Sequence, residues 1–370
     1  MPNSTSWRAP GRVNLIGEFT DYNAGFALPF AIEHCCTATV ERNEATEVVV
    51  TSAQRDDSVT VPLAGLDGAP DGWARYPLGV VWSLRQRGRE VPGLRIHLDS
   101  TVPGGAGLSS SAALVCSVGC AVSDLLALNL SSAELLAVTR AAENDFVGAP
   151  TGGLDQLAAL QCTAGHALLC DMRSLAVRQV PFDLAAAGLT MLVIDTRSRH
   201  RHATGEYGAR RAACEQAARL LGVEALRDVE ADELAAALAR LPDDLLRRCV
   251  RHVVTENHRV EQTAALLDRG ELEAIGPLLT ASHESLRTDY RVTIPELDLA
   301  VTTALAAGAL GARMTGGGFG GSVIALVPSA QAEACREAVA AAFAAHNFAA
   351  PAAFAAEAMP GARRVGAASE

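Results

Sequence analysis

The residues best suited to chemistry lie in short glycine-rich segments of this chain. In residues 102–114 (VPGGAGLSSSAAL), three glycines lead into three consecutive serines and a long apolar run. The pattern predicts a strand ending near Ser100 and a helix that starts at the serines. Unpaired N–H groups at a helix start favour an anion, and serine hydroxyls can bind a phosphate oxygen or Mg²⁺. The segment is therefore a candidate phosphate-binding loop, although a glycine-rich turn alone can be only a turn.

A second segment, residues 8–25 (RAPGRVNLIGEFTDYNAG), places short polar side chains between glycines and apolar residues. The polar residues are Arg12, Asn14, Glu18, Asp21 and Asn23. Carboxylates crowded between turns can accept hydrogen bonds from the hydroxyl groups of a polyol. The alternative is an Asx-rich turn whose charges are solvated.

Two further segments combine glycines with polar residues. In residues 143–156 (ENDFVGAPTGGLDQ), Asp155 follows a loop and could point into a cleft or merely cap a helix. In residues 311–323 (GARMTGGGFGGSV), the many glycines lose much backbone entropy on folding. Close approach of that backbone to a ligand or to a second chain is the natural explanation.

Composition excludes several classes of protein. The chain has 370 residues, enough for two domains, and its net charge of −11 argues against binding nucleic acid through a basic face. It contains no Lys at all. A Walker A loop and a protein kinase both need a lysine, so any ATP chemistry here must use Arg, backbone amides and Mg²⁺.

The cysteine content and the hydropathy of the chain indicate the cellular compartment in which the protein is found. The nine cysteines form no CxxC pair, which is typical of a reducing environment. The N-terminus has no basic-then-apolar signal pattern, and no apolar run approaches the roughly 18 residues of a membrane span. We therefore predict a cytoplasmic protein with no membrane partner.

Periodicity and turn residues predict mixed helix and strand content. Strands are predicted at residues 46–51, 94–98, 166–171, 190–195 and 322–327. Helices are predicted at residues 109–128, 210–221, 244–268, 295–307 and 329–346, with a capping box at Ser131-x-x-Glu134. The Ala-Pro tail after residue 346 is predicted to be weakly structured. We expect an N-terminal domain of residues 1–185 and a C-terminal domain of residues 186–370.

The four glycine-rich segments, in this order, resemble the GHMP superfamily of small-molecule kinases and, within it, the galactokinase family. The resemblance rests on residues 11–18 (GRVNLIGE), 20–23 (TDYN), 73–76 (WARY), 152–156 (GGLDQ), 205–211 (GEYGARR) and 314–319 (MTGGGF), and it extends over residues 8–327. It implies an α+β, two-domain GHMP kinase fold, with a ribosomal S5 domain 2-like N-terminal domain and a ferredoxin-like C-terminal α/β sandwich. The active site would lie in the interdomain cleft.

The resemblance also implies a reaction and its cofactors. ATP, with Mg²⁺, would phosphorylate D-galactose at its anomeric hydroxyl to give galactose 1-phosphate. The two small molecules would be the partners of a monomer or weak homodimer. Two alternatives stay open: a related sugar-1-kinase for an amino sugar, a uronic acid or a pentose, and a non-catalytic sugar sensor on the same fold. Glu18 argues against a uronic acid, because its carboxylate would face the carboxylate of the substrate where the family contacts the primary hydroxyl.

Roles follow by position from the resemblance. Asp155 matches the catalytic aspartate and Arg12 the arginine that orients it. The positions that match the sugar site are Glu18, Phe19, Asp21, Gly152 and Tyr207. The phosphate loop at 103–111 is matched by Gly104, Gly105, Gly107, Leu108, Ser109, Ser110 and Ser111. Ser111 and Glu143 match the Mg²⁺ ligands, and Trp73 and Tyr76 match residues near adenine.

One position departs from the family pattern. Galactokinases usually read Gly-Glu-His-Thr-Asp-Tyr where this chain has Phe19 after Glu18. A buried polar group that loses its partner costs about 1–3 kcal/mol, roughly 5–150-fold in affinity. Phe19→His is therefore expected to lower the KM for galactose in a steady-state assay. An unchanged or higher KM would show that the pocket does not need the imidazole.

Overall fold

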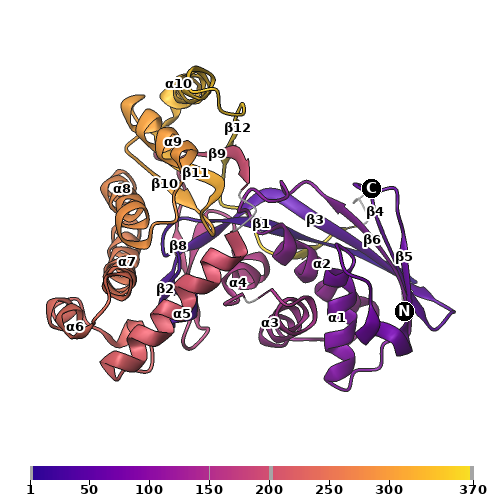
Figure 1. The fold of residues 1–370 in the computed structure, drawn as a ribbon. Helices are drawn as coiled ribbons and strands as arrows, with labels where there is room; N and C mark the ends of the chain where they lie inside the picture. Colours follow the sequence, from indigo (N-terminus) through magenta and orange to yellow (C-terminus); the bar gives the residue numbers. More distant parts are fainter. Residues whose placement is uncertain (1–2, 150, 200–202, 367–370) are drawn as a thin grey trace.

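Helices and strands build two lobes, one from the first half of the chain and one mainly from the second half (Figure 1). The structure is a computed structural model and describes residues 3–149, 151–199 and 203–366. Within these residues the strands form three sheets, and the helices pack on them or against one another.

The first lobe contains two of the sheets. Within the described residues the larger one has the strand order β13-β1-β3-β6-β4-β5, in which β4 runs parallel to β6 and the other pairs are antiparallel. Its strands are β1 (Ser4–Asn14), β3 (Pro29–Asn43), β4 (Glu47–Ser52), β5 (Val59–Pro62), β6 (Gly93–Ser100) and β13 (Arg363–Arg364). The smaller sheet consists of β2 (Phe26–Ala27), β7 (His166–Asp171) and β8 (Val177–Pro181).

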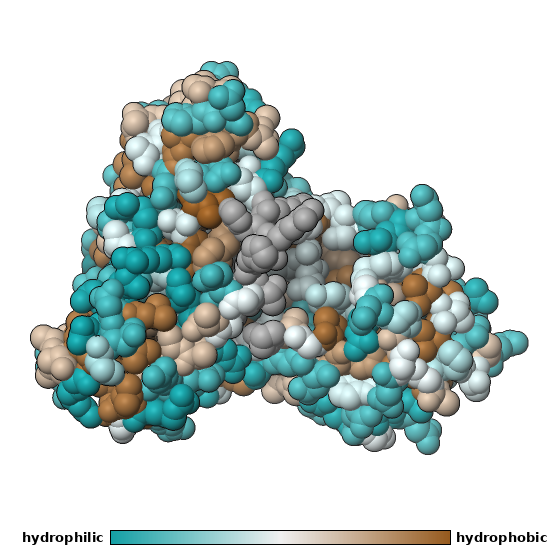
Figure 2. Space-filling view, viewed as in Figure 1, coloured by the Kyte–Doolittle hydropathy of each residue, from teal (hydrophilic) through white to brown (hydrophobic). Residues whose placement is uncertain are grey.

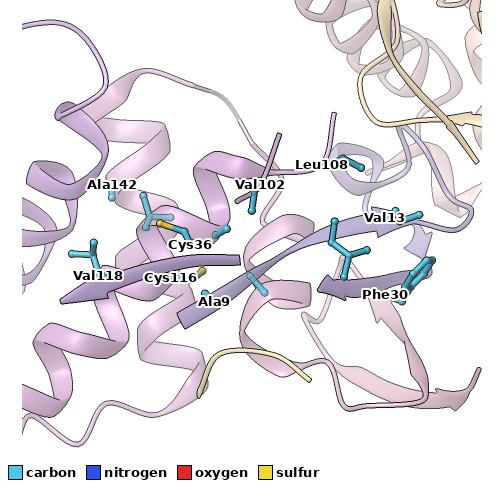
Figure 3. Packing of buried hydrophobic residues seen from close by; sticks show 14 of the residues in the cluster. Ala9, Val13, Phe30, Cys36, Val102, Leu108, Cys116, Val118 and Ala142 are labelled. Atoms are coloured by element: carbon cyan, nitrogen blue, oxygen red, sulfur yellow. The ribbon is translucent and has the colours of Figure 1, made fainter. Parts of the chain in front are cut away.

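One face of the larger sheet is covered by helices that bury its apolar side chains. Of these helices, α1 (Arg75–Gln86), α2 (Ser110–Leu125) and α4 (Leu154–Gln161) contact the sheet, and α3 (Ser132–Ala141) packs on these three helices. Figure 3 shows Ala9 and Cys36 from the sheet beside Cys116 and Val118 from α2. Because α2 packs on both β1 and β3, the start of α2 is fixed beside the end of β1.

The second lobe is built on a sheet of order β10-β11-β9-β12. Its strands are β9 (Leu189–Arg199), β10 (Gly311–Thr315), β11 (Gly320–Pro328) and β12 (Ala352–Ala356), and its helices are α5 (Ala203–Leu221), α6 (Leu234–Arg240), α7 (Asp244–Asp268), α8 (Gly276–Ser285), α9 (Pro295–Ala306) and α10 (Ala332–Ala345). β11 is buried over almost its whole length, as expected of a strand with neighbours on both sides.

The prediction for the C-terminal tail was wrong. Residues of β12 pair with β9 from Ala352 opposite Asp195 to Ala356 opposite Met191, and β13 pairs with β1 of the first lobe. Backbone hydrogen bonds to two existing sheet edges order this segment, whereas its alanine-rich composition carries no local signal for a strand. The tail therefore connects both lobes. The division of the chain at residue 185 stays a prediction.

Other local predictions are confirmed. The capping box forms: the Ser131 hydroxyl accepts from the Glu134 backbone N–H, and the Glu134 carboxylate accepts from the Ser131 N–H at 2.9 Å.

The space-filling view shows hydrophilic side chains over much of both lobes, with apolar residues in scattered groups (Figure 2). Among the helices of the described residues, none combines the length and the apolar character needed to span a bilayer.

Candidate functional site

The structure brings Arg12, Asp155 and the serine turn together. Nη2 of Arg12 lies 2.7 Å from Oδ1 of Asp155, and its Nη1 donates to the Gly107 carbonyl at 2.6 Å. The Ser109 hydroxyl donates to Oδ2 of Asp155 at 2.5 Å. The arginine side chain is 8% exposed and the aspartate side chain 24% exposed. Both oxygens of Asp155 are therefore held in place, while part of its carboxylate stays accessible.

The candidate phosphate loop has the backbone that its glycines predict. Gly105 and Gly107 have positive φ angles of 75° and 77°, and Ser109 follows with a φ of 58°. Such left-handed conformations expose successive N–H groups on one side of a turn, which suits an anion. The loop leads directly into α2, and the N–H groups of a helix start also favour an anion.

The glycine-rich segment of the second lobe packs against this loop. The Ser322 hydroxyl donates to the Ala106 carbonyl at 2.8 Å. A Cβ atom at Gly316 would lie 3.0 Å from the Gly107 carbonyl oxygen. Residues 311–323 thus approach the candidate phosphate loop of the same chain, a partner that the sequence did not predict, and this contact joins the two lobes at the site.

Glu143 lies beside the start of α2, on a π-helical turn (Ala142–Val147). It is 1% exposed; Gln156 donates to its Oε2, and its buried Oε1 has no hydrogen-bond partner within the described residues. Burial raises the pKa of Glu143 to about 7, and the nearby Asp155 adds to the shift while a hydrogen bond from Ser111 opposes it.

These residues fit a divalent cation. A buried carboxylate oxygen without a partner, next to a serine hydroxyl, is a donor set that Mg²⁺ accepts together with phosphate oxygens. In the part of the chain that the structure describes, no cluster of three or more His, Cys, Asp or Glu could hold a metal by itself. A cation here would therefore depend on substrate phosphates as well as on Glu143 and Ser111.

A cavity of about 370 Å³ opens next to Asp155, a size suited to a small polar ligand. It is lined by Arg12, Glu18, Phe19, Asp21, Gly152, Asp155 and the glycines at 316–318, among others. All the predicted sugar-site residues therefore border one cavity, except Tyr207. Tyr207 belongs to α5, but its side chain lies outside the described residues; Gly208 of the same helix lines the cavity.

Two carboxylates of the cavity are held in different ways. Glu18 is 5% exposed, and its Oε1 accepts from the Gly316 N–H at 2.7 Å and from the Thr315 hydroxyl at 3.2 Å. Asp21 is half-buried, and burial raises its pKa to about 6, with the negative charge of Asp155 as the next cause. Sequence reasoning missed Thr315 and Gly316 as partners of Glu18, although the glycine-rich segment around them marked the region.

Gly152 lies so close to Asp21 that a side chain would collide with it. A Cβ atom at Gly152 would lie 2.3 Å from Oδ2 of Asp21. Gly152→Ala is therefore expected to displace Asp21 and raise the KM of the predicted sugar substrate about tenfold, with a smaller change in kcat. Steady-state kinetics beside Gly68→Ala, where an added Cβ meets nothing within 4 Å, would check this. Equal KM values in both variants would contradict it.

Phe19 contributes an apolar wall. Its φ is 64°, and its ring lies 4.6 Å from Tyr290 and 6.4 Å from His252, measured between ring centroids. The residue is 4% exposed. A bulky residue with positive φ is uncommon and is retained where the surrounding packing enforces it. The replacement of the usual histidine is thus accommodated by aromatic packing.

Trp73 and Tyr76 do not line the cavity beside Asp155. The Trp73 indole donates to Asp57 at 3.2 Å, and the Arg55 guanidinium lies 5.7 Å from the ring centroid. Burial raises the pKa of Tyr76, and the negative charge of Glu143 adds to the shift. Tyr76 is therefore near the candidate cation site, and a role for the pair beside adenine stays a prediction.

Comparison with known proteins agrees with this geometry. Residues 2–42 match the model of the galactokinase galactose-binding signature, residues 75–162 match the GHMP kinases N-terminal domain, and residues 263–345 match the GHMP kinases C-terminal domain. A galactokinase of Streptomyces coelicolor is 55% identical over 97% of this chain and 94% of its own length. The chain belongs to the galactokinase family. A family member from Chloroflexus aurantiacus is 45% identical over 88% of this chain and 85% of its own length.

Solved structures place the fold in the same family. The Lactococcus lactis galactokinase complexed with galactose superimposes with a TM-score of 0.93 at 32% identity, over 98% of this chain and 95% of that one. A mevalonate kinase superimposes with a TM-score of 0.69 at 18% identity, over 96% of this chain and 99% of that one, which shows the fold alone. The expected α+β, two-domain GHMP kinase fold is confirmed for this galactokinase-family chain.

Proposed function

We propose that the chain transfers the γ-phosphoryl group of ATP to the anomeric hydroxyl of D-galactose, giving galactose 1-phosphate. The observation that carries the proposal is the position of Asp155: it borders the cavity and accepts a hydrogen bond from Ser109, the last residue before α2. An acceptor hydroxyl in that cavity and phosphates on residues 103–111 would lie on either side of one carboxylate. Phosphoryl transfer depends mainly on such positioning and on neutralisation of charge.

Asp155 and Arg12 would act on the acceptor oxygen. A carboxylate within hydrogen-bond reach orients the sugar hydroxyl and accepts its proton during transfer. Arg12 and Ser109 fix the two carboxylate oxygens, so orientation is supplied before the sugar binds. The guanidinium, which is largely withdrawn from solvent, would also offset negative charge on the transferring group.

The remaining residues would hold the two substrates. Glu18, Asp21, Gly152 and Tyr207 would bind the hydroxyls of the sugar, with Phe19 as an apolar wall. The backbone of residues 103–111 and the hydroxyls of Ser110 and Ser111 would hold the phosphates, and Trp73 and Tyr76 the adenine. A cytoplasmic location and a monomer or weak homodimer remain our expectation; the cysteines are all buried and unpaired, in keeping with a reducing compartment.

Glu143 and Ser111 would hold Mg²⁺. When bound, the ion offsets the charge of the phosphates. Without the ion, the raised pKa of Glu143 means that ionisation of this residue lowers the free energy of unfolding. This loss of stability is absent when the pH is below the usual pKa of 4.5, and it is complete once the pH exceeds about 7. Glu143→Gln is therefore expected to unfold several degrees higher than wild type at pH 8 without Mg²⁺, and to differ much less at pH 5.

Thermal unfolding at both pH values would measure this difference. The same variant should need a higher Mg²⁺ concentration for half-maximal activity, because the amide no longer supplies an anionic ligand. Glu90→Gln, at an exposed position, is a suitable control for loss of a glutamate charge. A Glu143→Gln protein that is less stable than wild type at pH 8 would contradict the assignment.

The proposed reaction can be separated from its alternatives in one assay. ADP release would be measured with a panel of D-galactose, galactosamine, galacturonic acid and a pentose, with Asp155→Asn as the control. Release with galactose and its loss in the variant would support the proposal. Release only with another sugar would indicate a related sugar-1-kinase, and binding of galactose without ADP release would indicate a sensor.

A further inference from the structure

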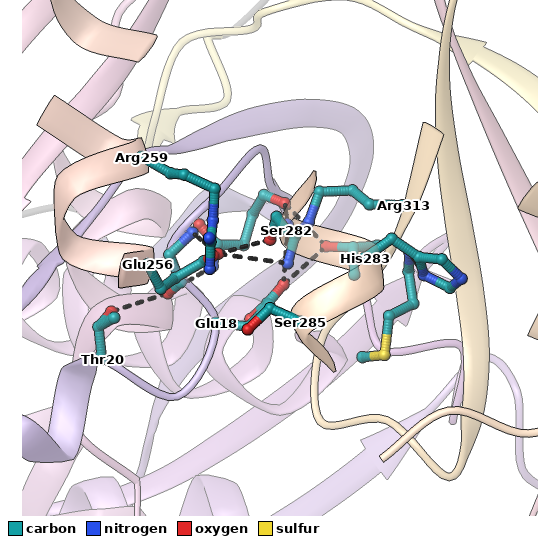
Figure 4. A network of polar contacts seen from close by, with 12 residues as sticks. Glu18, Thr20, Glu256, Arg259, Ser282, His283, Ser285 and Arg313 are labelled. Carbon is teal, nitrogen blue, oxygen red and sulfur yellow. Dashed lines mark hydrogen bonds and ion pairs between the residues drawn. The ribbon is translucent and has the colours of Figure 1, made fainter. Parts of the chain in front are cut away.

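A buried row of alternating charges connects Glu18 to helix α7 (Figure 4). Arg313 of β10 lies 3.5 Å from Glu18 and 3.9 Å from Glu256, measured from its Nη1 and Nη2 to the Oε1 atoms. Arg259, one turn along α7, lies 2.8 Å from the other oxygen of Glu256. The side chains of Arg313 and Glu256 are 0% exposed. Four charged residues from three separate segments thus meet, and the central pair, Arg313 and Glu256, is out of contact with solvent.

The row fixes the main chain that carries Glu18. Nη1 of Arg313 donates to the carbonyls of Asn14 and Leu15 at 3.1 and 3.0 Å. Oε1 of Glu256 accepts from the Gly17 N–H at 3.0 Å. The residues immediately before Glu18 are therefore held from both sides by the second lobe.

The carboxylate of Glu18 is held asymmetrically. Its Oε1 accepts hydrogen bonds from Thr315 and Gly316 and faces Arg313. Its Oε2 accepts no hydrogen bond within the described residues. Since Glu18 lines the cavity beside Asp155, Oε2 is the oxygen available to a ligand there. The protein binds one oxygen of the carboxylate and leaves the other for the substrate.

Stability alone is a poor reason for this arrangement. Removing charges from water is expensive, and well-packed apolar residues often stabilise a protein as well as a buried ion pair does. Nε and Nη2 of Arg313 also lack hydrogen-bond partners within the described residues, so part of the desolvation is not recovered. What the row does provide is a fixed, ionised acceptor at one place in the cavity wall.

We propose that Arg313 and Glu256 are positioning residues that set sugar selectivity by fixing the carboxylate of Glu18 against one substrate hydroxyl. The inference rests on the proposed function. A carboxylate that is held in advance binds a correctly placed hydroxyl without ordering itself first, and it gains nothing from a sugar that lacks the hydroxyl. The family resemblance places Glu18 at the primary hydroxyl, so the informative substrate is 6-deoxy-D-galactose.

The test compares kcat/KM for D-galactose and for 6-deoxy-D-galactose in Glu256→Gln. This variant is nearly isosteric and keeps an acceptor for Gly17, but it leaves Arg313 without its second anion. Selectivity for galactose is expected to fall about tenfold, through a higher galactose KM, with the deoxy sugar nearly unchanged. Arg259→Gln is a milder change at the more accessible end of the row. It should lower the ratio of kcat/KM for galactose to that for the deoxy sugar in the same direction, but by less. Arg248→Gln, which breaks an ion pair with the exposed Asp244 on the same helix, should leave this ratio unchanged.

Two outcomes would overturn the inference. Equal losses on both sugars in Glu256→Gln would mean that the row acts only on the fold. If the selectivity losses of Glu18→Gln and Glu256→Gln add fully in the double variant, Glu256 does not act through Glu18. If the double variant loses no more selectivity than Glu18→Gln alone, the proposal is supported. A wild-type chain that does not phosphorylate galactose would instead contradict the proposed function.

Discussion

Replacing Asp155 with Asn is expected to lower kcat for galactose about 10²–10⁴-fold while sugar binding changes little. The amide fills the same space, so the contacts of the cavity wall are kept. It cannot accept the proton of the acceptor hydroxyl, and its NH₂ group cannot satisfy both Arg12 and Ser109, which now donate to separate oxygens. Steady-state kinetics combined with calorimetric titration of galactose would separate the two effects.

Asp232→Asn, at an exposed turn of the second lobe, is the matched control and should retain wild-type kinetics. A kcat for Asp155→Asn within about tenfold of wild type would contradict the role of this carboxylate, because a positioned acid or base usually contributes more than that. Loss of galactose binding would instead show that Asp155 mainly shapes the cavity.

Arg12→Lys is expected to lower kcat about 10²-fold although it keeps the positive charge. Arg12 reaches Asp155 with one nitrogen and the Gly107 carbonyl with the other, so it ties the carboxylate that we propose to be catalytic to the candidate phosphate loop. A lysine ammonium is a single point charge and cannot make this planar, two-ended contact. The KM for galactose should change less than kcat.

Arg8→Lys in the same strand is the control, since Arg8 lies opposite Thr37 of β3 and does not line the cavity. Its kinetics should match those of wild type. If Arg12→Lys kept kcat within about threefold, the geometry of the guanidinium would be unimportant and only its charge would matter.

Local signals in the sequence were enough to predict much of the fold and the main features of the site. The glycine–serine turn predicted the start of α2, which begins at Ser110. Residues 166–171 were predicted to form a strand, and the structure has β7 with the same bounds. Glycine-rich turns also marked the segments that surround the cavity, because only such turns allow backbone to approach as closely as Gly316 and Gly107 do.

Contacts between distant segments could not be predicted from the sequence. The hydrogen bond from Gly17 to Glu256 joins residues 239 positions apart, and no local pattern indicates it. Glu256 resembles any charged residue on an amphipathic helix until the fold places it against the cavity loop. The strand β12 was missed for the same reason: its order comes from the edge of β9, whereas its own residues have little strand propensity.

A structure with D-galactose, Mg²⁺ and a non-hydrolysable ATP analogue would show directly whether Asp155 contacts the acceptor hydroxyl of the sugar. We expect the anomeric oxygen to lie about 2.6–3.2 Å from Asp155 and in line with a γ-phosphate bound by residues 103–111. We also expect that Arg12 still contacts Asp155 in the complex. An anomeric oxygen directed away from Asp155, or phosphates bound elsewhere than on the glycine–serine turn, would contradict the proposed mechanism.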